Sequence, residues 1–272
     1  MFAEGWPTIT CGTRGILFKE LRLSGPKHDL HSGSFGGSVA NPANVLAAII
    51  ASLHDDDGRV TIPGFYDDVI QATPAERETM RALPFDEPRY IVDTGVPGLT
   101  GEAGFTTNER RWIRPTLDVN GIFGGFSGKG ANTIIPKSAG AKVSMRLVPN
   151  QDSAKLSRQF DEAIQARCPD TVRLEIVEHG SAEAYVAPID GRPTQAARRA
   201  LEEAFGRAPA LIREGGSLPI LATFKRMLNA DSLLVGFADP NCNAHGPNEF
   251  VRIDDLNRGA EAIARVLAYL AE

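Results

Sequence analysis

Between residues 15 and 180 the chain carries strand and helix patterns in an order that strongly limits its fold. Strands are expected where apolar and charged residues alternate, and helices where apolar residues recur three or four positions apart. The order is strand, helix, strand, strand, helix, strand, which is the split βαβ or ferredoxin-like arrangement. The expected elements are Gly15–Leu23, Pro42–Leu53, Leu117–Phe123, Ala141–Val148, Asp152–Arg167 and Val172–Val177.

The remaining sequence divides into an insertion and a different C-terminal pattern. Residues from about 60 to 115 are Pro-rich and irregular, so we interpret them as an insertion into the ferredoxin-like part. After Pro188, helices alternate with a short apolar strand at Ser232–Phe237, which is typical of α/β proteins with a parallel sheet. Such a sheet needs further strands. We therefore expect a domain over 15–185, an incomplete α/β domain over 186–272, and a remnant of the latter at 1–14.

Composition excludes several classes of function. The 272 residues carry a net charge of −5, which gives no basic surface for nucleic acid. No apolar run approaches the ~20 residues of a spanning helix, so no membrane partner is expected. Three widely spaced cysteines favour a reducing, cytoplasmic setting over a disulfide framework. The first residues do not resemble a signal peptide, although a targeting signal could have been lost if the chain is truncated.

Two loops near the C-terminus suggest chemistry. Arg213–Pro219 is rich in backbone N–H groups, and a lone histidine, His245, lies in a Gly/Pro turn further on. Together they suggest a cradle for an oxyanion or carboxylate beside a metal ligand. A catalytic zinc usually has about three protein ligands, so His245 cannot hold one alone.

Two residues in the ferredoxin-like part are also candidates. Arg146 lies in an alternating strand, and it is either an exposed strand arginine or a fork that binds a substrate carboxylate. Periodicity does not choose between these readings. His28 and His31 have the spacing of a weak metal pair, and a role for His31 as a hydrogen-bond donor to a ligand is the better interpretation.

Other motifs do not pass their tests. The segment Gly124–Gly130 lacks the spacing of a phosphate-binding loop, and a hairpin connection fits it better. Ser217 is not in the G-x-S-x-G context of a serine hydrolase. The tandem acids at 55–57, 67–68 and 202–203 lie in turn or helix contexts that predict solvent-exposed faces.

Five segments in order resemble the zinc-dependent dipeptidase and deacylase family. Its members include carnosinase-like dipeptidases, glutamate carboxypeptidase, acetylornithine deacetylase and succinyl-diaminopimelate desuccinylase, and the carnosinase-like branch looks closest. The resemblance implies a ferredoxin-like lid, paired into a homodimer, inserted into a partial α/β zinc-peptidase catalytic domain. The five segments are Asp29–Gly33 with Gly36-Gly37, Asn132–Pro136, Met145–Pro149, Glu214–Pro219 and Ala244–Glu249.

The resemblance also implies roles for single residues. His245 is similar to a ligand of one of two zinc ions, and Arg146 to the residue that binds the terminal carboxylate of a small peptide or N-acyl amino acid. Gly216 and Ser217 resemble the substrate-binding loop. His31 and Thr133 resemble lid residues that reach the active site of the partner subunit, where His31 polarises the scissile carbonyl.

The family's other metal ligands and its glutamate general base precede the lid, and residues 1–14 resemble the segment that follows them. We therefore expect a fragment or shortened homologue that does not hydrolyse peptides by itself. The alternative is a non-catalytic dimerisation or regulatory module that keeps the fold. An unrelated carboxylate-binding α/β domain is a third interpretation, which the five ordered segments disfavour.

Overall fold

The chain folds into two compact units. A computed structural model describes the backbone of residues 1–272 and every side chain except that of Ala75. The lid unit comprises Arg14–Ala72 and Asp86–Ala184, and the C-terminal unit comprises Met1–Thr13, Thr73–Phe85 and Tyr185–Glu272. Part of the expected insertion, Thr73–Phe85, thus belongs to the C-terminal unit. The domain limits expected from the sequence stay a prediction.

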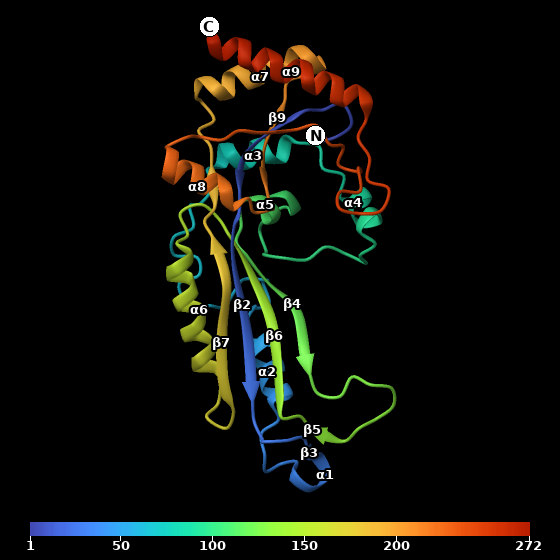
Figure 1. Ribbon diagram of the computed structural model, residues 1–272, viewed down its shortest axis with the longest axis vertical. Helices are drawn as coiled ribbons and strands as arrows, with labels where there is room; N and C mark the ends of the chain where they lie inside the picture. Colours follow the sequence, from blue (N-terminus) through green and yellow to red (C-terminus); the bar gives the residue numbers. More distant parts are fainter. The chain divides into compact units, whose positions relative to one another are not determined.

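The lid unit contains a four-stranded antiparallel sheet in the order β4-β6-β2-β7 (Figure 1). With α2 and α6 as its helices, this is the ferredoxin-like topology expected from the sequence. A two-stranded sheet, β3-β5, extends one end of the unit. The elements are β2 (Gly15–Ser24), β3 (Leu30–His31), α1 (Ser32–Phe35), α2 (Pro42–Ala51), α4 (Glu87–Thr94), α5 (Thr107–Trp112), β4 (Thr116–Gly124), β5 (Ile134–Ile135), β6 (Ser138–Leu147), α6 (Ser153–Arg167) and β7 (Arg173–Ala182).

Both long helices of the lid unit cover the same face of this sheet. Leu17 and Leu21 of β2 are fully buried and belong to one core cluster with Leu46 of α2 and Phe160 of α6. Residues two apart on a strand face the same side, so Phe18, between the two leucines, lies on the opposite face. Phe18 is exposed, which leaves that face of the sheet open.

The predicted helix boundaries hold closely where a cap is present. Asn41 accepts a hydrogen bond from Ala43 N–H at the start of α2, and Asp152 accepts one from Lys155 N–H at the start of α6. Both are N-cap contacts that satisfy amides without a partner inside the helix. At the end of α6, Arg167 is the last helical residue, as the sequence predicts.

The C-terminal unit has a mixed sheet built around β1. The strand β9 runs parallel to β1, whereas β8 and β10 are antiparallel to it, so the sheet is not the all-parallel one that we expected. Helices α7 and α9 pack together, and Leu201 and Ala262 are fully buried with Ile9 of β1. The elements are β1 (Thr8–Thr13), α3 (Pro74–Ala82), β8 (Tyr185–Val186), α7 (Arg192–Phe205), β9 (Ala210–Glu214), α8 (Pro219–Leu228), β10 (Leu234–Gly236) and α9 (Ile253–Ala271).

Candidate functional site

His31 and Thr133 lie side by side at the outer end of the lid unit. They come from segments about a hundred positions apart, and the pairing of β3 with β5 joins them, with His31 opposite Ile134. The carbonyl of Thr133 also accepts the N–H of Ser32 at 2.9 Å. Both His31 and Thr133 are exposed, so their side chains are available to a ligand or a second protein chain.

The histidine ring at this end has a defined orientation. His31 is the N-cap of α1, and its Nδ1 accepts the N–H of Gly33 at 3.1 Å. A neutral imidazole whose Nδ1 accepts a hydrogen bond carries its proton on Nε2. The ring therefore presents an N–H donor outward, which is the chemistry needed to bind a carbonyl oxygen or an oxyanion.

Asp29 fixes this end of the lid unit, a role that the sequence did not predict. Its carboxylate accepts the N–H of Lys137 at 2.8 Å. Asp29 lies two residues before His31, and Lys137 lies two residues after Ile135, the partner of Leu30. The contact joins the two segments just beyond the pair of Leu30 with Ile135. Asp29 stands next to the histidines in the sequence, but nothing local indicates a partner 108 positions away.

Arg146 lies near the opposite end of the main sheet. It occupies the penultimate position of β6, is half-buried, and pairs with Ile16 of β2 and Thr116 of β4. Thr133 precedes the start of β6, which lies at the same end as β3 and β5 (Figure 1). A strand rises about 3.3 Å per residue, so the length of β6 places Arg146 roughly 25 Å from that end. The structure thus joins His31 with Thr133 but separates both from Arg146 within one chain.

Gly216 and Ser217 lie in the loop between β9 and α8 of the C-terminal unit. Gly216 is exposed and Ser217 is half-buried. The N-cap of α8 is Leu218, which forms no side-chain hydrogen bond to the helix. The N–H of Gly215 in this loop donates to the Glu214 carboxylate at 3.0 Å, and the cradle for an anion stays a prediction.

His245 lies in a strained turn with an exposed side chain. Its backbone adopts the left-handed conformation, with a φ of 62°, and so do Asn243 and Asn248 on either side. The N–H of His245 approaches the Glu249 carboxylate at 3.4 Å. This backbone geometry is uncommon for residues other than glycine and is often found at functional sites.

The His245 turn is anchored by a buried acid that the sequence analysis missed. Asp239 is 3% exposed, accepts the N–H of Asn241 at 2.8 Å, and pairs with Arg252 Nε at 3.0 Å. Burial disfavours the ionised Asp239 carboxylate, but the Asn241 N–H and the Arg252 guanidinium outweigh burial and lower its pKa. The ion pair thus joins the two ends of the turn that presents His245.

The described side chains include no complete set of metal ligands. Within residues 1–272, apart from the side chain of Ala75, no group of three or more His, Cys, Asp or Glu side chains is arranged to hold a metal ion. The exposed imidazole of His245 suits one ligand position, and the described side chains supply no complete set. The three cysteines are free thiols, and no described helix is long and apolar enough to cross a membrane.

Comparison with known proteins identifies the family. The family model described as a peptidase dimerisation domain matches residues 11–172, more than half of the chain. The chain therefore belongs to the zinc-dependent dipeptidase and deacylase family of metallopeptidases, as the five ordered segments indicated.

Characterised relatives and solved structures agree with this assignment. The Cys-Gly metallodipeptidase DUG1 of Saccharomyces cerevisiae is 33% identical over 271 residues, which cover 98% of this chain and 56% of that protein. The human Beta-Ala-His dipeptidase is 28% identical over 269 residues, which cover 98% of this chain and 53% of that protein. The metallo-carboxypeptidase Sso-CP2 from Sulfolobus solfataricus superposes with a TM-score of 0.88 at 32% identity, over 99% of this chain and 61% of that one. This chain spans about half the length of these curated relatives.

Proposed function

We propose that this chain supplies the dimerisation lid and the substrate-binding loops of a metallodipeptidase that hydrolyses dipeptides or N-acyl amino acids. The observation that carries the proposal is the meeting of His31 and Thr133 at one end of the lid sheet, with Arg146 near the other end. Since one chain cannot bring these residues to one substrate, two copies must share each site. The names of the relatives, which are Cys-Gly and Beta-Ala-His dipeptidases, support the substrate class.

Each residue has a role that its chemistry suits. The planar fork of Arg146 binds the terminal carboxylate of the substrate in bidentate fashion. The backbone of Gly216 and the Ser217 side chain also bind the substrate. His31 from the second copy donates its Nε2–H to the oxygen of the scissile carbonyl, where negative charge develops, and Thr133 assists it.

The metal part of the proposal concerns one residue of this chain. His245 would be one ligand in a site of two zinc ions, and bound zinc supplies polarisation of the carbonyl and a lowered pKa for water. No reaction step follows from the described residues alone. A cytoplasmic location is also part of the proposal, and the three free thiols support it.

The carboxylate role of Arg146 can be tested by substitution in the catalytically complete enzyme. Arg146→Lys should lower kcat/KM for dipeptides with a free C-terminal carboxylate by about tenfold to a hundredfold, because lysine loses the bidentate contact. C-terminally amidated dipeptides should be poor substrates of the parent enzyme and should lose little more. Equal losses on both substrate types would show that Arg146 does not bind the carboxylate.

A second candidate function is a dimerisation or regulatory module without catalysis. The family model that matches residues 11–172, which describes a peptidase dimerisation domain, supports it. Purified residues 1–272 should retain far less than one zinc per chain after dialysis against a weak chelator. They should also not hydrolyse a dipeptide panel with added zinc, manganese or cobalt. Zinc-dependent turnover that disappears in His245→Ala would contradict this expectation and would show that the chain holds a complete site.

A further inference from the structure

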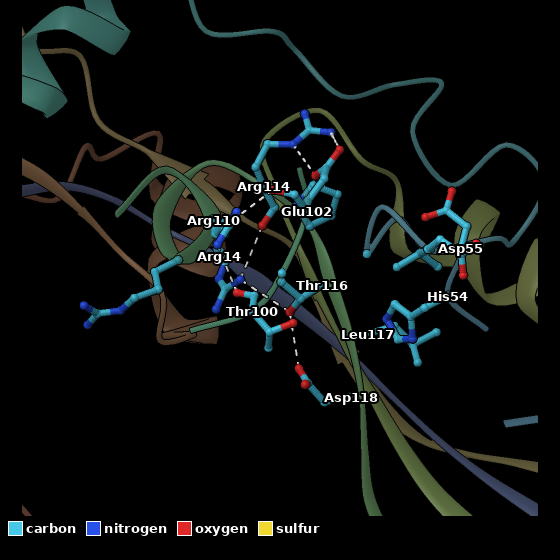
Figure 2. Close-up of a pocket in the computed structure, with 16 residues that line it drawn as sticks. Arg14, His54, Asp55, Thr100, Glu102, Arg110, Arg114, Thr116, Leu117 and Asp118 are labelled. Carbon is cyan, nitrogen blue, oxygen red and sulfur yellow. Dashed lines mark hydrogen bonds and ion pairs between the residues drawn. The ribbon is translucent and has the colours of Figure 1, made fainter. Parts of the chain in front are cut away.

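A cavity in the lid unit lies at the edge strand β4 and has no role in the proposed hydrolysis. Its volume is about 620 Å³, and its walls come from α5, from the turn after α2 and from the start of β4 (Figure 2). All of its lining residues belong to the lid unit. Figure 2 shows Arg110 and Asp55 on opposite sides of this space, with Asp118 below them in this view.

One wall is positively charged and lacks a balancing carboxylate. Arg110 donates to the backbone carbonyls of Glu102, at 2.9 Å, and Thr100, at 3.1 Å, which are neutral acceptors. The guanidinium of Arg111 lies 5.2 Å from the centre of the Tyr90 ring, and no described side chain forms an ion pair with it. Both arginines are only half-exposed, so water screens their charges incompletely.

The glutamate that lines this wall, Glu102, is already neutralised. Glu102 is 6% exposed and binds Arg114 through two hydrogen bonds of 2.7 Å each, and it also accepts Arg59 at 2.8 Å. Arg114 is itself buried and stacks on the Phe105 ring at 4.4 Å. The charge of Glu102 is therefore already balanced by Arg114 and Arg59.

The facing wall is negatively charged and fixed in place. Asp55 accepts the N–H groups of Asp57 and Arg59 at 3.0 and 2.8 Å, which hold the turn after α2. Asp56 follows it and has no partner among the described side chains, and Asp118 contacts the Thr116 hydroxyl at 3.4 Å. None of these three acids forms an ion pair with a described arginine or lysine, so the two walls do not neutralise each other.

We infer that this cavity is a second binding site, for a small zwitterion such as a free amino acid or a short peptide. The carboxylate of such a ligand would bind Arg110 and Arg111, and its ammonium group would bind Asp55, Asp56 and Asp118. A ligand with a single charge can form charge-assisted hydrogen bonds at one wall only. A zwitterion can form them at both walls and should therefore bind more tightly. The site is separate from the proposed active site, although Thr116 on its floor is the strand neighbour of Arg146.

A fluorescence titration of residues 1–272 tests this inference. The chain has two tryptophans, and Trp112, next to Arg111 and buried, becomes the single reporter when Trp6 is replaced by phenylalanine. Glycylglycine should bind saturably with a Kd of about 1 mM, and acetate and methylamine should each bind at least tenfold more weakly. Calorimetry on the parent chain should give the same order of affinities.

Variants separate this site from the proposed active site. Arg111→Gln and Asp56→Asn should each weaken glycylglycine binding about tenfold or more, whereas Arg158→Gln, an exposed charge-matched control on α6, should not. Arg146→Gln should leave the Trp112 response intact. The inference is overturned if no saturable response occurs up to about 50 mM peptide, if acetate or methylamine binds equally well, or if Arg146→Gln alone abolishes binding.

Discussion

Glu20 is a carboxylate of the lid unit whose ionisation the fold controls strongly. It lies on the open face of the sheet with its side chain 7% exposed. Three groups surround its carboxylate, namely Arg22 Nε at 2.7 Å, His179 Nε2 at 2.8 Å and Lys142 Nζ at 3.1 Å. These hydrogen bonds, with that of Arg22 the strongest, lower the pKa of Glu20 to about 2.

The lowered pKa of Glu20 makes a prediction about acid stability. A carboxyl group with a lower pKa in the folded state stabilises the fold above its unfolded pKa of about 4.3, and this stabilisation is lost as the pH falls towards 2. Glu20→Gln should therefore show a smaller fall in Tm between pH 6 and pH 3 than the parent chain. Glu162→Gln, which changes an exposed glutamate on α6, is the matched control and should follow the parent. Identical pH profiles for Glu20→Gln and the parent would mean that Glu20 gains nothing from its partners on folding.

Helix α8 is the least supported of the long elements. Its apolar side chains are largely exposed, with Met227 and Leu228 at 70%, and Leu221 is the one buried residue of the helix. In contrast, Phe160 and Ile164 of α6 are fully buried. We therefore expect α8 to be more labile than α6.

Hydrogen exchange should reflect this difference between helices. Backbone amides of α8 should exchange about 100-fold faster than those of α6, because opening α8 exposes little buried apolar surface. Helix α7, in the same unit but with Ala200 and Leu201 fully buried, is the internal control and should exchange slowly. Peptides from α8 protected as strongly as those from α6 would contradict the predicted lability.

Elements with a clear local sequence pattern were predicted well, whereas elements that depend on distant pairing were not. Helix α6, which has a cap and apolar periodicity, begins within one residue of the predicted start and ends at Arg167 as predicted. Strand β9 was missed, because Arg213 and Glu214 made its end resemble a loop while its pairing with β1 joins residues about 200 positions apart. The candidate site follows the same rule. Arg146 and His245 lie in recognisable sequence motifs, so they could be predicted. The contacts of Asp29 and Asp239 join residues that only folding brings together, so they could not.

At the scale of the whole molecule, the proposed site needs residues from two copies of the chain. The lid sheet has edge strands β4 and β7, and exposed edges of this kind commonly need cover. A homodimer formed through residues 15–185 would provide it and would also carry His31 and Thr133 to a second chain. The family model, which describes a peptidase dimerisation domain, supports this arrangement.

The most direct test of the shared site is cross-linking in a mixed dimer. Unlabelled and heavy-isotope-labelled chains are combined at about 50 μM, within the range expected for an interface of standard size, and treated with a lysine-specific cross-linker. Lys129 lies in the exposed loop before Thr133, and Lys225 lies on α8 beyond the Ser217 loop. If two copies share each site, Lys129–Lys225 links should form between labelled and unlabelled chains. These links should disappear in Lys129→Arg. Links confined to single chains, or chains that remain monomeric at this concentration, would contradict the shared site.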